Sequence, residues 1–257
     1  MKLEKPVLQK HVDLLIGHLA TYEGKKVAAD LHYAIRALTL DIITSYCFGS
    51  CFSATEYPGF QHPVSTSLEA TIYLCWWFKH IPILRTIADN VPEWIVRAVW
   101  PATRGFYDQS DHLGEQIDAI LDDPAILRQS EHDTMYHYFL ENLTDKKGLP
   151  SAGGKELQTM TPRERAETRL WLLHEGLNLR FAGSETVGGA CTAATFYLLR
   201  NPAAKKRLVD ELVAAWPDVD QYLGYEELEK LPYLVSIRNF IAELVGRFPD
   251  TFLDCRY

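Results

Sequence analysis

Hydrophobic residues recur along most of this chain at intervals of three and four, the period of a helix that buries one face. The first run predicts a helix between Val7 and Leu19, before Gly24. A second predicted helix has Asp30 as its N-cap and ends at Gly49, a residue suited to the left-handed turn after a helix. No segment alternates apolar and polar residues as a half-buried strand does. The pattern therefore predicts a mainly α fold.

Proline and glycine residues divide the middle of the chain. Residues 51–63 are interpreted as a loop, and a helix is predicted over about 64–79. Another helix is predicted from about Pro92 to Leu121, because Asp123-Pro124 would break it. Residues 146–154, which are rich in glycine, predict a flexible loop.

The longest predicted helix has clear boundaries. Thr161 is a suitable N-cap, with a proline after it and Glu164 in the position of a capping box, and Asn201-Pro202 supplies the stop. The resulting rod would be about 55–60 Å long at 1.5 Å per residue. Four glycines interrupt it, each costing about 1 kcal/mol relative to alanine: Gly176, Gly183, Gly188 and Gly189. We therefore expect something to approach its backbone closely.

The centre of this helix reads Phe181-Ala182-Gly183-Ser184-Glu185-Thr186. It resembles the oxygen-binding helix of the cytochrome P450 family, whose motif is Ala/Gly-Gly-x-Asp/Glu-Thr-Thr, and it departs at the last position, Val187. The resemblance implies that haem lies against Ala182 and Gly183. It also implies two catalytic residues: Thr186 would hydrogen bond to bound oxygen, and Glu185 would help relay protons from solvent. Small residues and a hydroxyl inside a helix also suit close helix packing, which is the structural alternative.

Other segments resemble the same family in the same order. They are residues 36–49, 201–212 and 226–234, so the resemblance covers most of residues 1–234. It implies a partial cytochrome P450-like helical domain built around one long central helix. Residues 235–257 are interpreted as a divergent C-terminal tail.

The chain departs from the family after Leu234. Phe240 stands where the family has the glutamate of its Glu-x-x-Arg motif, and the Phe-x-x-Gly-x-Arg-x-Cys-x-Gly haem-ligand loop does not occur. Cys255 lacks the glycines that frame the ligand in that loop. The resemblance implies haem, and NADPH through a reductase, for the full-length family. This chain is expected to be truncated before the haem-ligand loop, to be inactive alone and to hold no haem stably.

Composition narrows the possible partners. With 257 residues, of which 47% are hydrophobic, the chain can bury the core of one globular body. Its net charge of −8 argues against a nucleic-acid partner. No apolar run of about 18 residues exists, so no transmembrane segment is predicted. The start, Met1 to Pro6, has no anchor, whereas the resemblance implies an endoplasmic reticulum membrane location for full-length members.

The cysteines and histidines predict no metal site. The five cysteines are odd in number and scattered, which suits a reducing intracellular compartment. Cys47 and Cys51 lack a second ligand pair, and His174-Glu175 lacks the second histidine of a zinc-protease motif. His132 and His137 are interpreted as ordinary histidines.

An aromatic stretch runs from Tyr73 to Trp100 and contains Trp76, Trp77 and Trp94. Core packing is the expected role of most of its side chains. The resemblance also places it where helices roof the substrate cavity and touch lipid.

Two functions remain open. One is a fragment of a monooxygenase that oxidises a lipophilic small molecule, with secondary metabolism as a guess. The other is a helical binding or interaction protein without chemistry. A terpene synthase is rejected, because Asp122-Asp123 lacks the third carboxylate that would clamp magnesium and diphosphate.

Overall fold

The computed structural model describes residues 4–142, 160–218 and 223–247. In these ranges every regular element is an α-helix or a short 3-10 helix, which confirms the mainly α prediction. The chain forms two compact units, residues 1–185 and 186–257, and the long helix α8 (Pro162–Arg200) runs from the first into the second. Its bounds agree with the predicted start and stop.

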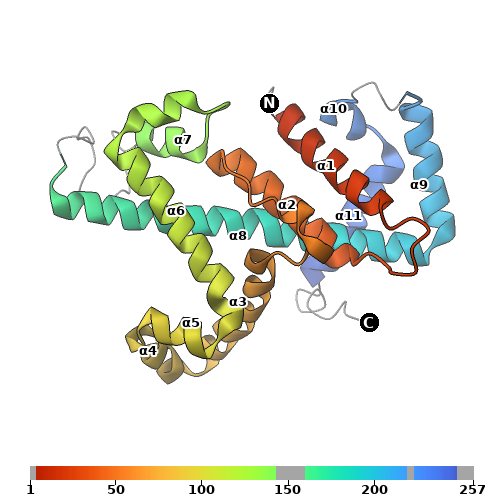
Figure 1. Ribbon diagram of the computed structural model, residues 1–257. Coiled ribbons are helices and arrows are strands. Elements are labelled where there is room, and N and C mark those ends of the chain that lie inside the picture. The colour runs from red at the N-terminus through yellow and green to blue at the C-terminus, as the bar shows by residue number, and fades with distance from the viewer. Residues whose placement is uncertain (1–3, 143–159, 219–222, 248–257) are drawn as a thin grey trace. The chain divides into compact units, whose positions relative to one another are not determined.

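The first unit contains α1 to α7 and the first part of α8. Figure 1 shows α2 and α6 lying across α8. The other bounds are α1 Glu4–Ala20, α2 Leu31–Phe48, α3 Pro63–His80, α4 Pro82–Asn90, α5 Glu93–Val99, α6 Arg104–Asp122 and α7 Met135–Asn142. One core cluster joins the end of α2 to α6, α7 and α8, around Phe48, Leu113 and Leu172. A second joins α1 to α2, around Leu15 and Leu40.

The predicted caps are confirmed. The Asp30 carboxylate accepts hydrogen bonds from two backbone N–H groups in the first turn of α2. Gly49 ends α2 with a φ of 66°, and its N–H donates to the carbonyl of Ser45. At the start of α8, the Thr161 N–H donates to Glu164 Oε2 at 2.8 Å, and the Glu164 N–H donates back to Thr161 Oγ1 at 3.3 Å. These contacts are local, which is why the sequence alone could indicate them.

Prolines divide the chain more finely than predicted. The helix expected from about Pro92 to Leu121 is two helices, α5 and α6, separated by a 3-10 turn at Pro101–Thr103. Pro82 begins α4, a helix that the sequence analysis did not predict. Proline has no N–H to donate and clashes with the preceding turn, so it starts a helix more readily than it continues one.

The predicted loop 51–63 contains two 3-10 turns, Ala54–Glu56 and Pro58–Phe60. The predicted loop 146–154 lies outside the described residues.

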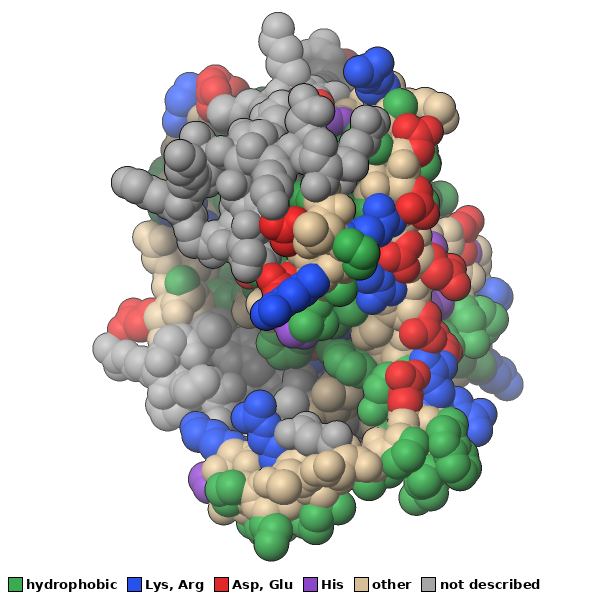
Figure 2. All heavy atoms as spheres, turned by 90° about the vertical axis from the view of Figure 1, so that its left-hand side faces the viewer, with side chains coloured by type: hydrophobic (Ala, Val, Ile, Leu, Met, Phe, Trp, Pro, Cys, Tyr) green, Lys and Arg blue, Asp and Glu red, His purple; other side chains and the backbone are tan. Residues whose placement is uncertain are grey.

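The expectation of core packing for the aromatic stretch was wrong. Its tryptophans are between 42% and 71% exposed, namely Trp76, Trp77, Trp94 and Trp100, and Val99 is 79% exposed. Figure 2 shows hydrophobic side chains at the lower end of the molecule, the end formed by α4 and α5 in Figure 1. The helical spacing of these residues indicated an apolar face but could not show what covers it.

Gly105 lets α6 begin against the start of α3. A Cβ at this position would lie 2.2 Å from the Pro63 carbonyl oxygen and 2.9 Å from Ser67 Oγ. Because backbone must move to relieve that overlap, we expect Gly105→Ala to destabilise the protein by about 1–3 kcal/mol in urea unfolding. Gly17→Ala is the matched control, because an added Cβ there meets nothing within 4 Å. Equal midpoints for the two variants would show that the α3–α6 contact adjusts freely.

The second unit contains the end of α8 and α9 to α11. The bounds are α9 Pro202–Ala215, α10 Tyr225–Leu228 and α11 Pro232–Arg247. The Glu211 carboxylate of α9 accepts hydrogen bonds from the Tyr233 and Leu234 N–H groups at 2.9 and 2.8 Å, so α9 caps the start of α11. Since α11 runs through position 234 without a break, the predicted boundary between residues 1–234 and the tail stays a prediction.

None of the helices in the described ranges combines the length and apolar character that crossing a membrane requires.

Candidate functional site

One strip of α8 carries two of the residues that the sequence singled out. Asn178, Ala182 and Thr186 follow one another at intervals of four residues, and all three are exposed. Phe181 lies beside them and is 42% exposed. The opposite side of the helix is buried, at Gly176, Arg180 and Ser184. Because residues four apart share a helix face, Ala182 and Thr186 lie next to each other on the open side.

Gly183 faces a neighbouring helix. A Cβ on Gly183 would lie 2.6 Å from both Cγ1 and Cδ1 of Ile43 in α2. The glycine therefore leaves room for the Ile43 side chain, which would have to shift if a Cβ were added. This contact accounts for Gly183 by packing and leaves Ala182 as the small residue on the exposed strip.

Glu185 forms an ion pair with Arg36 of α2. Only 8% of the Arg36 side chain and 10% of the Glu185 side chain are exposed. One residue earlier, the Ser184 carbonyl accepts a hydrogen bond from Thr39 Oγ1 at 3.0 Å. Thus α2 fixes α8 at the predicted motif through a buried charge pair and a buried hydrogen bond. The pair also means that the Glu185 carboxylate is held by a cation.

Arg180 is a buried charge that the sequence analysis did not single out. Its side chain is 1% exposed, and Nε and Nη1 have no hydrogen-bond partner in the part of the chain that the structure describes. Burial lowers the pKa of its guanidinium to about 10, an effect that the nearby Glu185 carboxylate opposes. Arg180 therefore stays protonated at neutral pH. An arginine between the apolar residues Leu179 and Phe181 is a signal that could have drawn attention to it.

A cavity of about 570 Å³ lies in the first unit beside the exposed strip. Its size falls in the usual range for small-molecule pockets. It is lined from three helices, by Leu68 and Thr71 of α3, Phe106 of α6, and His174, Leu177, Asn178, Arg180 and Phe181 of α8. The cavity can hold an apolar molecule against the same side of α8 that exposes Phe181 and Asn178.

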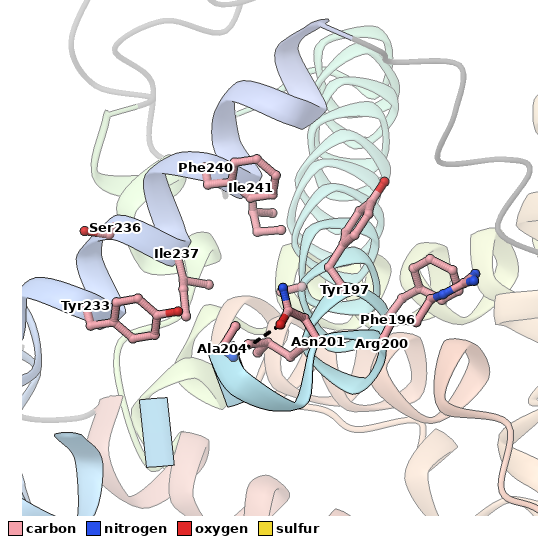
Figure 3. A pocket seen from close by; sticks show the side chains of 12 residues that line it. Phe196, Tyr197, Arg200, Asn201, Ala204, Tyr233, Ser236, Ile237, Phe240 and Ile241 are labelled. Atoms are coloured by element: carbon pink, nitrogen blue, oxygen red, sulfur yellow. Dashed lines mark hydrogen bonds between the residues drawn. The ribbon is translucent and has the colours of Figure 1, made fainter. Parts of the chain in front are cut away.

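The second unit has its own cavity, of about 710 Å³, between the end of α8, the start of α9, and α11 (Figure 3). Its walls are mainly aromatic and aliphatic. The rings of Tyr197 and Phe240 pack in a T-shaped, edge-to-face arrangement with their centroids 6.3 Å apart. No sequence-predicted site residue lines it. The described residues that line this cavity include no carboxylate and no imidazole, so they offer no general base of those kinds.

The exposed strip fits one face of a planar apolar cofactor such as haem. Ala182 leaves room for a ring to approach, and Thr186 places a hydroxyl one turn away. The cysteines described as free thiols are Cys47, Cys51 and Cys191, and none of them belongs to the strip. Cys255 lies outside the described residues. The described residues therefore supply one side of such a site and no identified axial ligand.

Comparison with known proteins gives matches to one family. The family model described as Cytochrome P450 matches residues 3–243. A cytochrome P450 monooxygenase of Eupenicillium brefeldianum is 31% identical over 244 residues, which are 94% of this chain and 45% of that protein. A second from the same fungus is 30% identical, with 90% and 42% covered. One of Sordaria araneosa is 28% identical, with 90% and 43% covered. The chain spans less than half the length of these relatives.

Proposed function

This chain belongs to the cytochrome P450 family, and we propose that it supplies the oxygen-activating helix and a wall of the substrate cavity of a haem-thiolate monooxygenase. The observation that carries the proposal is the exposed strip with Ala182 and Thr186, beside a mainly apolar cavity. A helical binding protein without chemistry would need neither the hydroxyl nor the small residue on that open face.

Each residue of the motif has a distinct proposed role. When bound, haem supplies the one-electron chemistry that inserts one atom of O2 into a substrate. Ala182 lets the ring lie close to α8, and Thr186 Oγ1 holds a proton at the surface of the strip. Glu185 exchanges protons with solvent when its ion pair with Arg36 opens. Gly183 acts indirectly, since the approach of α2 that it allows brings Arg36 to Glu185.

The axial thiolate is proposed to come from sequence other than these 257 residues. Neither the Glu-x-x-Arg motif nor the glycine-framed cysteine loop of the family occurs among them. A haem held on one side only lacks the ligand that fixes its iron and sets its electronics. We therefore propose that the isolated chain is inactive and does not hold haem stably.

The proposed substrate is a lipophilic small molecule that enters the cavity of about 570 Å³. Arg180 at the edge of this cavity favours a molecule that carries a hydrogen-bond acceptor. A fungal secondary metabolite is the proposed class. NADPH through a reductase is the proposed electron source, and the exposed tryptophans of α3 to α5 suit contact with an endoplasmic reticulum membrane.

A carbon monoxide spectrum tests this proposal. Residues 1–234 are joined to the C-terminal half of the 31% identical Eupenicillium brefeldianum relative, and the product is reduced under carbon monoxide. We expect the Soret band of a thiolate-ligated haem from this chimera, and no such band from the 257-residue chain supplied with hemin. A chimera with a native helical circular dichroism spectrum but no haem band would favour the binding-protein alternative. A thiolate band from the chain alone would contradict the proposed missing ligand.

A further inference from the structure

A second cluster of chemically active side chains lies where α1, α2 and the loop after α2 meet. His11, Asp41 and Cys51 each contribute one ligand-type atom, and these atoms all lie within 4.8 Å of one another. His11 and Asp41 are buried, whereas the thiol of Cys51 is on an exposed residue. The three residues are ten or more positions apart, so no spacing motif in the sequence marks them.

One ring nitrogen of His11 has no hydrogen-bond partner among the described residues. Its Nε2 lies 2.9 Å from Ser45 Oγ, within hydrogen-bond distance. Its Nδ1 is buried and has no hydrogen-bond partner among the described residues, although only 4% of His11 is exposed. Buried polar atoms are nearly always paired, so such a nitrogen calls for an explanation. A metal cation, which accepts the lone pair of an imidazole nitrogen, is one group that could bind Nδ1.

We propose that His11, Asp41 and Cys51 bind a divalent cation of the zinc class. Imidazole nitrogen, carboxylate oxygen and thiolate sulfur are the three donor types of zinc sites. The sulfur argues against magnesium and calcium, which prefer oxygen. The cation takes the place of the Cys51 thiol proton, which is released to solvent. Atoms that already lie within 4.8 Å of one another need only a small contraction to surround one ion.

Neighbouring groups hold the proposed ligands in place. The two oxygens of Asp41 accept hydrogen bonds from the N–H groups of Ala54 and Thr55, each at 2.8 Å. Ser45 Oγ lies within hydrogen-bond distance of His11 Nε2 and so holds the ring. Contacts of this kind fix the direction of metal ligands. They also fix the loop that carries Cys51 relative to α2.

The site has room for a fourth ligand. A cavity of about 430 Å³ is lined by His11, Ser45 and Cys51, among other residues. Water from this cavity can complete a tetrahedron. None of the three proposed ligands lines the larger cavity beside α8. The cation is therefore assigned no part in the chemistry proposed for that cavity, and when bound it would tie α1 to α2 and the following loop.

Cobalt titration of the whole chain tests this assignment. Co²⁺ replaces Zn²⁺ and makes the site visible, because a thiolate ligand gives a charge-transfer band and tetrahedral geometry gives intense visible bands. The chain is stripped with EDTA and titrated with Co²⁺. We expect both bands to saturate at one equivalent, Zn²⁺ to abolish them, and the unfolding temperature to rise with either metal.

Matched variants locate the ligands. Cys51→Ser is expected to remove the charge-transfer band, and His11→Gln to weaken Co²⁺ binding at least about tenfold. Cys191→Ser changes another exposed thiol and is expected to leave both bands unchanged. A variant with the other four cysteines replaced by serine must keep the band, which covers the case in which Cys51→Ser fails to fold.

Two results would overturn the proposal. One is a folded wild-type chain that binds no stoichiometric Co²⁺. The other is a charge-transfer band that survives in folded Cys51→Ser or disappears when only the other four cysteines are replaced. Either result would leave the cluster as a hydrogen-bonded group in which the Cys51 thiol keeps its proton.

Discussion

Replacing Thr186 by alanine in the chimera with a restored haem-binding half is expected to leave haem uptake unchanged and to uncouple the reaction. Without the Thr186 hydroxyl on the exposed strip of α8, proton delivery fails, and electrons from NADPH leave as hydrogen peroxide. General acid catalysis of this kind contributes about 10²–10⁴-fold, so product formed per NADPH should fall at least about tenfold. The measurement is hydrogen peroxide and product per NADPH consumed.

Thr192→Ala is the matched control on the same helix. The Thr192 hydroxyl donates to the Gly188 carbonyl at 2.8 Å, a bond within the helix. Its loss should change stability slightly and leave coupling unchanged. If Thr186→Ala behaves like Thr192→Ala, with equal peroxide ratios and a loss of about 1 kcal/mol or less, Thr186 is a packing residue and its catalytic assignment is removed.

Breaking the ion pair between α2 and α8 is expected to have the largest effect on stability. Arg36→Ala removes the cation that is ion-paired with the buried Glu185 carboxylate, and removing one partner of a buried pair costs about 3–5 kcal/mol. Both side chains are at least 90% buried, so solvent screens the pair little. The loss is measured by urea unfolding, followed by the circular dichroism of the helices.

Two further variants test whether that loss of stability comes from the buried ion pair. Arg36→Met combined with Glu185→Met removes both charges of the pair and should recover part of the loss. The recovery is limited because Glu185 also lies near the buried charge of Arg180. Arg163→Ala breaks an exposed pair with Glu167 on α8 and should leave the urea midpoint nearly unchanged. Equal midpoints for Arg36→Ala and Arg163→Ala would show that the buried pair contributes little to the fold.

Much of the secondary structure followed from local signals. The caps at Asp30, Gly49 and Thr161 involve residues within a turn of one another, so their sequence pattern is sufficient to predict them. The family resemblance seen around Ala182 to Thr186 is confirmed by the match over residues 3–243. Proline positions were harder to interpret. Pro82 starts α4, which was not predicted, and Pro101 starts a 3-10 turn inside a stretch that was predicted to be one helix.

The site was predicted only in part. Ala182 and Thr186 share the exposed strip, as their spacing of four requires. The sequence could not show that Gly183 faces Ile43 or that Glu185 is paired with Arg36, 149 residues away. Their roles in chemistry stay predictions.

The sequence by itself determined the ends of α2 and α8, the family and the absence of the haem-ligand motif from these 257 residues, because each depends on residues close together in the chain. Only the tertiary structure decided which apolar faces are covered. The exposed tryptophans of α3 to α5 have the same helical spacing as buried residues. Periodicity shows that a helix has an apolar face, but it does not show whether another element packs against that face. The tertiary structure also decided that His11, Asp41 and Cys51 lie close together. The distances between them depend on how α1 packs against α2, which the order of residues in the chain does not reveal.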